Sequence, residues 1–234
     1  MKLTVLHPAY FPNIKMLSRI ASADVVVWGE TFIYKKHSTM NRARIKSVSG
    51  PQWLTVPVLT TGKSQQLIHD VLVDSEHAWR HTHLKSLHVC YQNSPYYFFL
   101  ADDVQEILNR EWINLNALLW QSVLFLCKKT RIMREFVKSS DLLAVKNRSR
   151  RVVEWLKQCG CDSYVIVPDE LPFIDTDYIE KNGYSIYQQN FLQPRYHQLF
   201  KGFVSDLSGL DLLFNEGEMS KSIILKNTSI SKAG

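Results

Sequence analysis

The chain lacks the local signatures that identify several common enzyme classes. It contains no GxSxG nucleophile elbow and no phosphate-binding P-loop, and its nine glycines are scattered through 234 residues. These absences argue against the familiar α/β-hydrolase and nucleoside triphosphatase designs. An HExxH motif is also absent, so His77 and His81, four positions apart, are interpreted as residues at the boundary of a helix face. No metal or other cofactor is predicted.

Long apolar runs and paired cysteines are scarce as well. The densest apolar stretch, 115–127, is interrupted by Asn116 and Gln121, so no membrane-spanning helix is predicted. His7 and Pro8 break the apolar start of the chain, unlike a signal peptide, and we expect a cytoplasmic protein. The four cysteines form no CxxC pair and are expected to be packing residues in a reducing compartment: Cys90, Cys127, Cys159 and Cys161.

Size and composition are those of an ordinary globular protein. Of the residues, 45% are hydrophobic and 21% are charged, which suffices for one large core. We expect residues 1–225 to form a single α/β domain and residues 226–234 to form a flexible tail. The formal net charge of +6 favours an anionic partner such as a phosphate or a nucleotide. Because the cations do not alternate with aromatic residues, no nucleic-acid partner is predicted.

The first residues predict a strand, a loop, a helix and a second strand. The apolar run Leu3 to Leu6 stops at the loop 7–12, which holds a histidine, two prolines and an aromatic pair. Helical spacing follows over 14–23, and a β-branched run begins at Val25. In open α/β sheets ligands bind outside the carboxyl ends of the strands. The loop is therefore predicted to form the wall of a site, and the alternative is that it only caps the core.

The middle of the chain predicts a hairpin and a group of helices. Residues 31–58 alternate polar and apolar side chains around the turn signal Gly50-Pro51, and are expected to form antiparallel strands that project from the sheet. A further β-strand is predicted at 67–73. Helical periodicity then predicts an insertion at about 76–128, with helices near 76–91, 97–109 and 115–128.

Strands and helices alternate again toward the carboxyl end, which is typical of parallel pairing through βαβ units. The predicted fold class is therefore α/β, with a mostly parallel, Rossmann-like sheet flanked by helices, a β-hairpin excursion and a helical insertion. Strands are predicted at 135–137, 164–167 and 185–189, and helices at 147–159 and 176–182.

Cationic side chains are concentrated between Lys35 and Lys46. Residues two apart on a strand share a face, so Arg42, Arg44 and Lys46 are expected to point the same way and to hold a phosphate through the arginine forks. We further expect these arginines and His7, at the end of the first strand, to converge on one cavity. The alternative interpretation is a solvated charged face.

Five segments together resemble the WbqC-like family, and the resemblance covers nearly the full length. They are HPAYFP at 7–12, IASADVVV at 20–27, MNRARIKS at 40–47, PQWLTVPV at 51–58 and QPRYHQLFKGFVSDLSGLDLLFNEG at 193–217. The family is found with genes for O-antigen and other surface-polysaccharide assembly and is described as a transferase family without a settled reaction. This chain departs from the pattern at Pro8, at Asn13 and in the stretch VIVPDE, which ends at Glu170.

The resemblance implies a set of site residues. The segment Asp211 to Phe214 is interpreted as a helix with an inward apolar face, ended by Asn215 and Gly217. Carried over position by position, the implied site residues are His7, Tyr10, Asn41, Arg42, Arg44, Lys46, Tyr196, Gln198, Asp211 and Asn215. Lys35 joins the substrate- or phosphate-binding group through its place in the basic segment.

The sequence EMSKS at 218–222 resembles the KMSKS loop of class I aminoacyl-tRNA synthetases, whose lysine stabilises charge on nucleotide phosphates. The HIGH-type partner motif is missing, because no second histidine follows His7 closely. The resemblance implies ATP-dependent, adenylate-forming activation of an amino acid as an alternative function.

The leading hypothesis from the sequence is a cytoplasmic transferase of surface-polysaccharide synthesis. It would modify a nucleotide- or lipid-linked amino sugar by transfer from an acyl or aminoacyl donor. His7 would act as general base, Tyr10 would orient the acceptor and Asp24 would hold the imidazole tautomer. Besides adenylate formation, a non-catalytic module that binds a glycan or a partner protein remains an alternative. The oligomeric state is not predicted.

Overall fold

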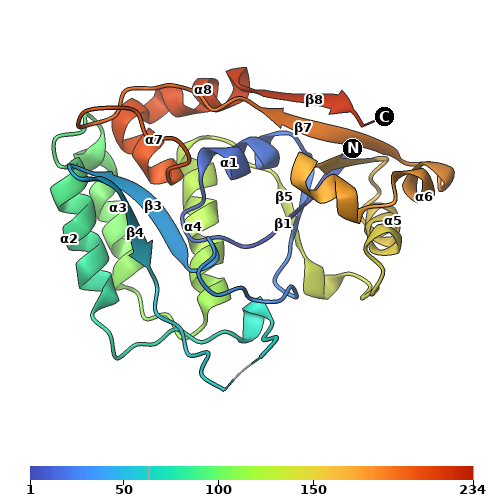
Figure 1. Ribbon diagram of the computed structural model, residues 1–234, viewed down its shortest axis with the longest axis horizontal. Coiled ribbons are helices and arrows are strands. Elements are labelled where there is room, and N and C mark those ends of the chain that lie inside the picture. Colours follow the sequence, from blue (N-terminus) through green and yellow to red (C-terminus); the bar gives the residue numbers. More distant parts are fainter. Residues whose placement is uncertain (63, 234) are drawn as a thin grey trace.

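The computed structural model describes residues 1–62 and 64–233, and its centre is a six-stranded sheet (Figure 1). The strand order is β5-β2-β1-β6-β7-β8. All neighbours pair in parallel except β7 and β8, which are antiparallel. The strands are β1 (Lys2–Leu6), β2 (Val25–Trp28), β5 (Glu135–Lys138), β6 (Ser163–Ile166), β7 (Ser185–Phe191) and β8 (Thr228–Lys232).

The α/β fold class and the mostly parallel sheet are confirmed, and so is the hairpin outside the sheet. The hairpin consists of β3 (Arg42–Ser47) and β4 (Gly50–Thr55), which pair only with each other in a separate two-stranded sheet. Its turn lies at Val48 and Ser49, and Gly50 follows with a φ of 109°, a conformation that favours glycine.

Two apolar cores cover the two faces of the sheet, because successive strand residues point to opposite sides. Leu6 and Val26 belong to the larger core, whereas Leu3 and Val25 belong to the smaller one. The larger core contains side chains from α1 (Ile14–Ala21), α2 (Trp79–Tyr91), α3 (Tyr97–Asn109), α4 (Leu115–Lys129), α7 (Gly209–Glu216) and α8 (Ser220–Lys226). The smaller core contains side chains from α5 (Arg148–Gln158) and α6 (Thr176–Lys181).

The strand order reverses direction between β1 and β6. The chain leaves β1 through α1 toward β2 on one side, and later enters β6, on the other side of β1, through α5. These two helices cover opposite faces of the sheet. Such a topological switch point opens a crevice at the carboxyl ends of the strands, where α/β proteins bind ligands.

The predicted strand at 67–73 is wrong. The structure has a short 3-10 helix there, Ile68–Asp70, flanked by isolated bridges from Leu67 to Ile33 and from Val73 to Val58. Apolar side chains at Ile68 and Val71 are fully buried, so their periodicity reflects packing of an irregular segment against the core.

Part of the flexible tail predicted at 226–234 has regular structure, and residue 234 lies outside the described residues. Residues Thr228–Lys232 form β8, which pairs antiparallel with β7 from Phe191 to Tyr187. The polar composition that suggests a frayed end suits an exposed edge strand equally well, because three of the five β8 residues are exposed.

No helix within the described ranges is long and apolar enough to cross a membrane. The four cysteines carry free thiols, and Cys90, Cys127 and Cys161 are buried packing residues.

Candidate functional site

A hollow lies at the switch point. Its volume is about 690 Å³, which is within the usual range of small-molecule sites. Elements that meet at the carboxyl edge of the sheet form its wall: the end of β1, the loop after β2, the loop after β6 and the first turns of α5. The lining residues are Val5, His7, Thr31, Phe32, Ile33, Lys35, Leu67, Lys146, Arg148, Arg151, Val152, Trp155, Tyr164, Glu170 and Ile174.

The wall of the hollow is strongly cationic. Lys35, Lys146, Arg148 and Arg151 line it, and Glu170 is the single carboxylate in the lining. Glu170 is already engaged, because the Arg19 guanidinium donates to both of its carboxylate oxygens at 2.9 and 2.8 Å. Four cations therefore face the hollow with little neutralisation, which favours an anionic ligand.

The amino end of α5 adds to the positive potential. Asn147 caps this eleven-residue helix and accepts a hydrogen bond from the Arg150 backbone N–H at 3.0 Å. No acidic residue occupies the first turn of the helix. The helix dipole and the side chains of Arg148 and Arg151 therefore act in the same direction, as in known phosphate sites at helix N-termini.

Aromatic rings form another part of the wall. Phe32 and Trp155 lie nearly parallel, 6.4 Å apart at an interplanar angle of 15°. The Arg151 guanidinium lies 5.3 Å from each ring centroid. Partial burial and the neighbouring charge of Arg148 lower the pKa of Arg151. Flat apolar surfaces beside a cation suit a ligand that combines a ring with a phosphate.

His7 stands in the wall of the hollow, beside Phe32 at 4.8 Å between ring centroids. The His7 side chain is exposed to solvent in the hollow, while the protein atoms around it remove part of its hydration. This loss of hydration, with the charges of Arg19, Lys35 and Arg148, lowers the pKa of His7 to about 4 against the opposing effect of Glu170. The imidazole is therefore neutral at physiological pH, and its ordinary pKa of about 6.5 does not apply here.

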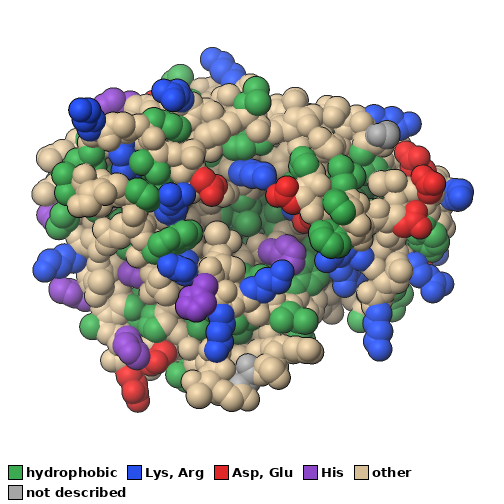
Figure 2. All heavy atoms as spheres, in the orientation of Figure 1, with side chains coloured by type: hydrophobic (Ala, Val, Ile, Leu, Met, Phe, Trp, Pro, Cys, Tyr) green, Lys and Arg blue, Asp and Glu red, His purple; other side chains and the backbone are tan. Residues whose placement is uncertain are grey.

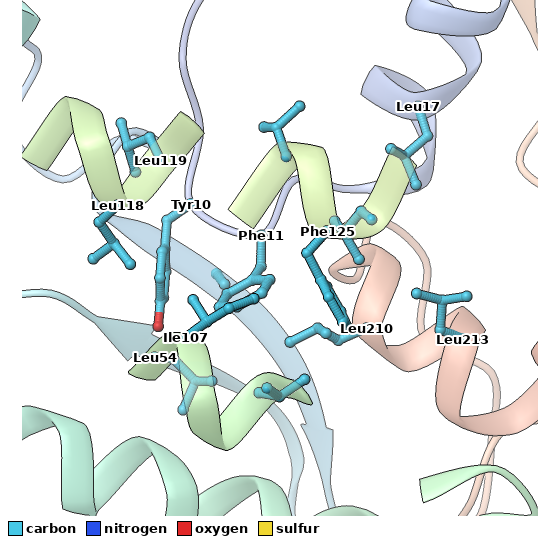
Figure 3. Packing of buried hydrophobic residues seen from close by; sticks show 14 of the residues in the cluster. Tyr10, Phe11, Leu17, Leu54, Ile107, Leu118, Leu119, Phe125, Leu210 and Leu213 are labelled. Atoms are coloured by element: carbon cyan, nitrogen blue, oxygen red, sulfur yellow. The ribbon is translucent and has the colours of Figure 1, made fainter. Parts of the chain in front are cut away.

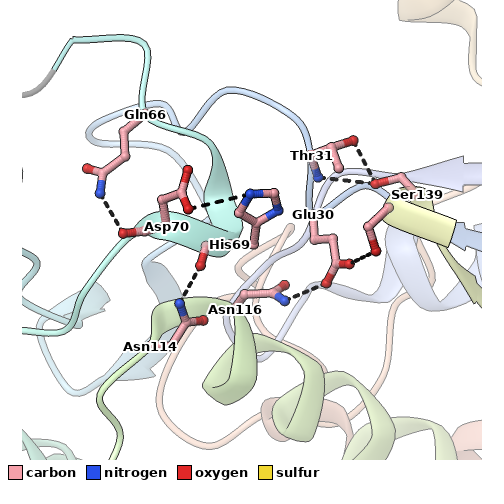
Figure 4. A network of polar contacts seen from close by, with 9 residues as sticks. Glu30, Thr31, Gln66, His69, Asp70, Asn114, Asn116 and Ser139 are labelled. Atoms are coloured by element: carbon pink, nitrogen blue, oxygen red, sulfur yellow. Dashed lines mark hydrogen bonds and ion pairs between the residues drawn. The ribbon is translucent and has the colours of Figure 1, made fainter. Parts of the chain in front are cut away.

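A polar network holds the loop after β2 in place (Figure 4). The buried Glu30 carboxylate accepts hydrogen bonds from Asn116 at 2.7 Å and from Ser140 at 2.6 Å. The Ser139 hydroxyl accepts a bond from the Thr31 backbone N–H at 3.1 Å. These contacts fix the segment that carries Phe32 and Lys35 into the hollow. Figure 2 shows a hollow near the middle of one face, with basic, acidic and histidine side chains around it.

The sequence matches the model of the WbqC-like protein family over residues 7–223. The chain belongs to the WbqC-like protein family. The match begins at His7 in the wall of the switch-point hollow and includes every residue that lines it except Val5.

A relative of this WbqC-like protein comes from Mycobacterium tuberculosis, the uncharacterized protein Rv1507c. The two are 28% identical over 218 residues, which cover 92% of this chain and 94% of the relative. No solved structure gives a significant match.

Two predicted site residues, His7 and Lys35, come together in the hollow. Tyr10 does not join them, because its side chain points into the core (Figure 3) and is 1% exposed. The Tyr10 hydroxyl lies 3.0 Å from His83 Nδ1, and burial raises the pKa of this tyrosine. Tyr10 therefore cannot orient a substrate in this hollow.

Asp24 is also placed differently from the prediction. It precedes β2, whereas His7 follows β1, so in a parallel pair the two residues lie at opposite edges of the sheet. The Asp24 carboxylate accepts a hydrogen bond from the Lys2 backbone N–H at 2.8 Å. Asp24 cannot hold the tautomer of His7.

The predicted convergence of His7 with the basic strand is not found. Arg42 and Arg44 line a separate, smaller hollow of about 80 Å³ that shares no lining residue with the first. Lys46 lies on the same strand but does not line this hollow. It is 2% exposed, and its ammonium group donates to the carbonyl oxygens of Phe200, at 3.3 Å, and Gly202.

The remaining residues implied by the family resemblance hold backbone segments together. The Asn41 side chain donates to the Val56 carbonyl at 2.8 Å. Gln198 exchanges two hydrogen bonds of 2.9 Å with the backbone of Val204. Tyr196 donates to the buried Asp211 carboxylate at 2.7 Å.

The carboxyl end of this motif is helical, as the sequence indicates. Asp211, Asn215 and their neighbours lie in α7, and Gly217 follows it with a φ of 51°. Asn215 is buried, and its side chain donates to the Asp211 carbonyl at 2.7 Å.

The EMSKS segment lies away from the switch-point hollow. Glu218 forms an exposed ion pair with Arg131 at 2.8 Å, and Ser220 begins α8. None of its residues lines either hollow described above. The histidines around the start of α2 also have different roles: His77, before the helix, pairs with Asp74 at 3.0 Å, whereas His83, in the helix, is buried beside Tyr10. Within the described residues no group of His, Cys, Asp or Glu is arranged to hold a metal.

The α5 side of the hollow was not predicted from the sequence, and it consists of Lys146, Arg148, Arg151 and Trp155. The run KNRSRR at 146–151 contained a usable signal. An asparagine cap followed by cations in the first turn opposes the usual preference for acidic residues at that position. Such a departure from local helix stability is typical of an anion site.

Proposed function

We propose that this protein is a transferase of surface-polysaccharide synthesis that acts on a nucleotide- or lipid-linked amino sugar. It adds an acyl or aminoacyl group to the sugar nitrogen. The observation that supports this function is the switch-point hollow, where four cations, a helix N-terminus, two aromatic faces and a neutral imidazole meet. The surface-polysaccharide setting follows from the resemblance to the WbqC-like family.

The diphosphate of the substrate accounts for the cations. Arg148 and Arg151 each offer a guanidinium fork, and the α5 N-terminus offers its dipole in the same place. Lys35 and Lys146 supply further charge from other segments. Phe32 and Trp155 provide flat surfaces for a base or sugar ring. A hollow of about 690 Å³ accommodates such a ligand.

The transfer step uses His7 as a proton acceptor. The neutral sugar amine attacks the carbonyl carbon of a thioester or aminoacyl ester donor, and the new C–N bond replaces the C–S or C–O bond. Attack makes the nitrogen acidic, so an imidazole with a pKa of about 4 can take its proton. The proton then passes to the departing thiolate or alkoxide, which leaves His7 neutral again.

Ligand binding is tested first, by isothermal titration with nucleotide-linked amino sugars. We expect wild-type protein to bind at least one of them, and Arg148→Met and Arg151→Met each to weaken binding by roughly tenfold or more. The matched control is Arg110→Met, which removes an exposed arginine paired with Glu106 on α3. Unchanged affinity in both hollow variants, or no binding by the wild type, contradicts the proposal.

Transfer is tested next, by mass spectrometry of the bound sugar after incubation with acyl thioesters and aminoacyl esters. A mass increase equal to one acyl group is expected with the wild type. His7→Asn is expected to keep sugar affinity within a few-fold and to lose most turnover. Binding that depends on Arg148 without any transfer would favour the non-catalytic glycan-binding module.

A further inference from the structure

We propose that Arg42 and Arg44 form a second, separate oxyanion subsite, which holds a phosphate or carboxylate group of the second substrate. The hollow that they line is about 80 Å³. That space corresponds to roughly two or three water molecules, so it fits one oxyanion group and excludes a nucleotide or a sugar ring. The two hollows lie along the same loop, since His7 lines the larger one and Ala9, Tyr10 and Pro12 line the smaller one.

The two arginines hold unused hydrogen-bond donors. Arg42 is stacked on Trp53 with its guanidinium carbon 4.5 Å from the ring centroid. This contact fixes the planar group, yet the Arg42 Nε is buried and donates no hydrogen bond. In the part of the chain that the structure describes, neither guanidinium forms an ion pair. The guanidiniums that line the hollow are therefore not neutralised by a carboxylate, and their terminal N–H groups can donate to a bound anion.

The amino end of α1 points at the same hollow. Pro12, Asn13 and Met16 line it, and the helix begins at Ile14 without an acidic residue in its first turn. Asn13 accepts a hydrogen bond from the Met16 backbone N–H at 3.0 Å. The helix dipole therefore adds to the charge of the arginine pair, from a different element.

The backbone around the hollow has positive φ values at two positions. Phe11, next to the lining residues, has a φ of 36°, and Asp206, in the lining, has a φ of 60°. A bulky residue in this region is costly and persists only where its surroundings hold it. Here the Ser208 hydroxyl donates to the Phe11 carbonyl at 2.7 Å, and the Phe11 N–H donates to the Ser122 hydroxyl at 3.1 Å.

One carboxylate also lines the hollow. Asp206 accepts a hydrogen bond from the Asn13 side-chain amide, so two guanidiniums face one carboxylate that already has a partner. The net charge of the residues that line the hollow therefore remains positive. Anion binding here does not depend on the proposed function, whereas the assignment to the acyl or aminoacyl donor rests on it.

The experiment titrates inorganic phosphate, and separately acetate, into protein whose larger hollow is disabled by Arg148→Met and Arg151→Met. We expect saturable binding of at least one anion in this background. Adding Arg44→Met is expected to weaken it by roughly tenfold or more. Arg44→Lys, which keeps the charge and loses the fork, should recover only part of the affinity. Adding Arg110→Met should change nothing.

A second measurement uses the unmutated chain, so its result does not depend on whether the variants fold. Phosphate or acetate should shift the Nε–H resonances of Arg42 and Arg44 in arginine-labelled protein, and the tighter anion identifies the group that the donor carries. The subsite is refuted if neither anion shifts these resonances, or if Arg44→Met binds as its background does. A protein that binds no nucleotide sugar but shows the Arg44-dependent anion affinity would refute the proposed function and leave the subsite standing.

Discussion

At the scale of the residue, the Tyr10–His83 pair shows how burial decides protonation. His83 Nε2 lies 3.1 Å from the Thr55 carbonyl, which can only accept, so this nitrogen carries the proton. His83 Nδ1 then accepts from the Tyr10 hydroxyl. Burial lowers the pKa of His83 to about 4, against the raising effect of the Thr55 carbonyl. The arrangement is complete only while the imidazole is neutral.

We predict that this histidine destabilises the protein in acid. The unfolded pKa is about 6.5 and the folded pKa is about 4, so the unfolded chain binds more protons between these values. The contribution is fully present above pH 6.5 and is lost as the pH falls toward 4. The His83 contribution should fall by about 2 kcal/mol between pH 7 and pH 5.

The measurement is urea unfolding at both pH values, for the wild type and for His83→Gln. His7 titrates in both proteins, so its effect cancels in the comparison. A variant whose stability depends on pH as strongly as that of the wild type would show that His83 is not the titrating group.

A second prediction at this scale concerns the buried Asp211. Tyr91 and Tyr196 donate to its two oxygens at 2.8 and 2.7 Å. Burial raises the pKa of Asp211, and these hydrogen bonds oppose the rise. Tyr196→Phe should therefore lower the free energy of unfolding at pH 7 by about 2 kcal/mol. The loss should shrink in acid, because a protonated Asp211 needs the hydrogen bond less.

Chemical denaturation at pH 7 and pH 4.5 measures the effect of Tyr196→Phe. Tyr178→Phe, on the outer helix α6, is the matched control and should cost little at either pH. An equal loss at both pH values would assign the Tyr196 effect to packing instead of to the carboxylate.

At the scale of the element, β8 completes the sheet from the last residues of the chain. It pairs five residues with β7, from Thr228 opposite Phe191 to Lys232 opposite Tyr187. Its first residue also bonds to α1, since the Thr228 hydroxyl donates to Ser18 Oγ at 2.7 Å. The strand thus ties the carboxyl end to the helix that begins at the small hollow.

We predict that deleting residues 228–234 lowers the free energy of unfolding by about 3 kcal/mol, from several backbone hydrogen bonds of roughly 1 kcal/mol each. Thermal or urea unfolding measures the change, and deletion of residue 234 alone is the control. Loss of the edge strand should also expose β7, so the shortened protein should associate more readily. Unchanged stability would mean that the strand contributes nothing to the fold.

At the scale of the whole molecule, charge and shape act together. The formal net charge is +6, and four of the cations meet at the switch-point hollow while two more line the small one. Positive potential inside a concave surface attracts anions over a distance comparable with the Debye length, about 10 Å at 0.1 M salt.

Binding of a nucleotide-linked sugar should therefore weaken with ionic strength. We predict a loss of affinity of roughly fivefold or more between 50 and 500 mM potassium chloride, as screening shortens the reach of the charges. The uncharged nucleoside, measured by the same titration, should show little dependence on salt. Equal salt dependence for both ligands would show that the cations of the hollow do not contribute to binding.

Several features could be predicted from residues because they depend on neighbours along the chain. The β-branched runs at Val25 and Val165, with helical spacing between strands, follow directly from the periodicity of buried side chains. The loop after β1 was expected at a site, and His7 and Lys35 do meet there. The strand prediction for 67–73 was wrong because the apolar pattern of a buried irregular turn resembles that of a strand.

What the sequence by itself determined is the α/β class, the family and the supply of cations, since these depend on local pattern and composition. Only the tertiary structure decided which cations share a hollow. It joined His7 to Arg148 and Arg151, which lie far along the chain, and separated His7 from Arg42 and Arg44. The reason is physical: strand order and the crossover side of each helix arise from packing of the whole sheet, and no local pattern of residues encodes them.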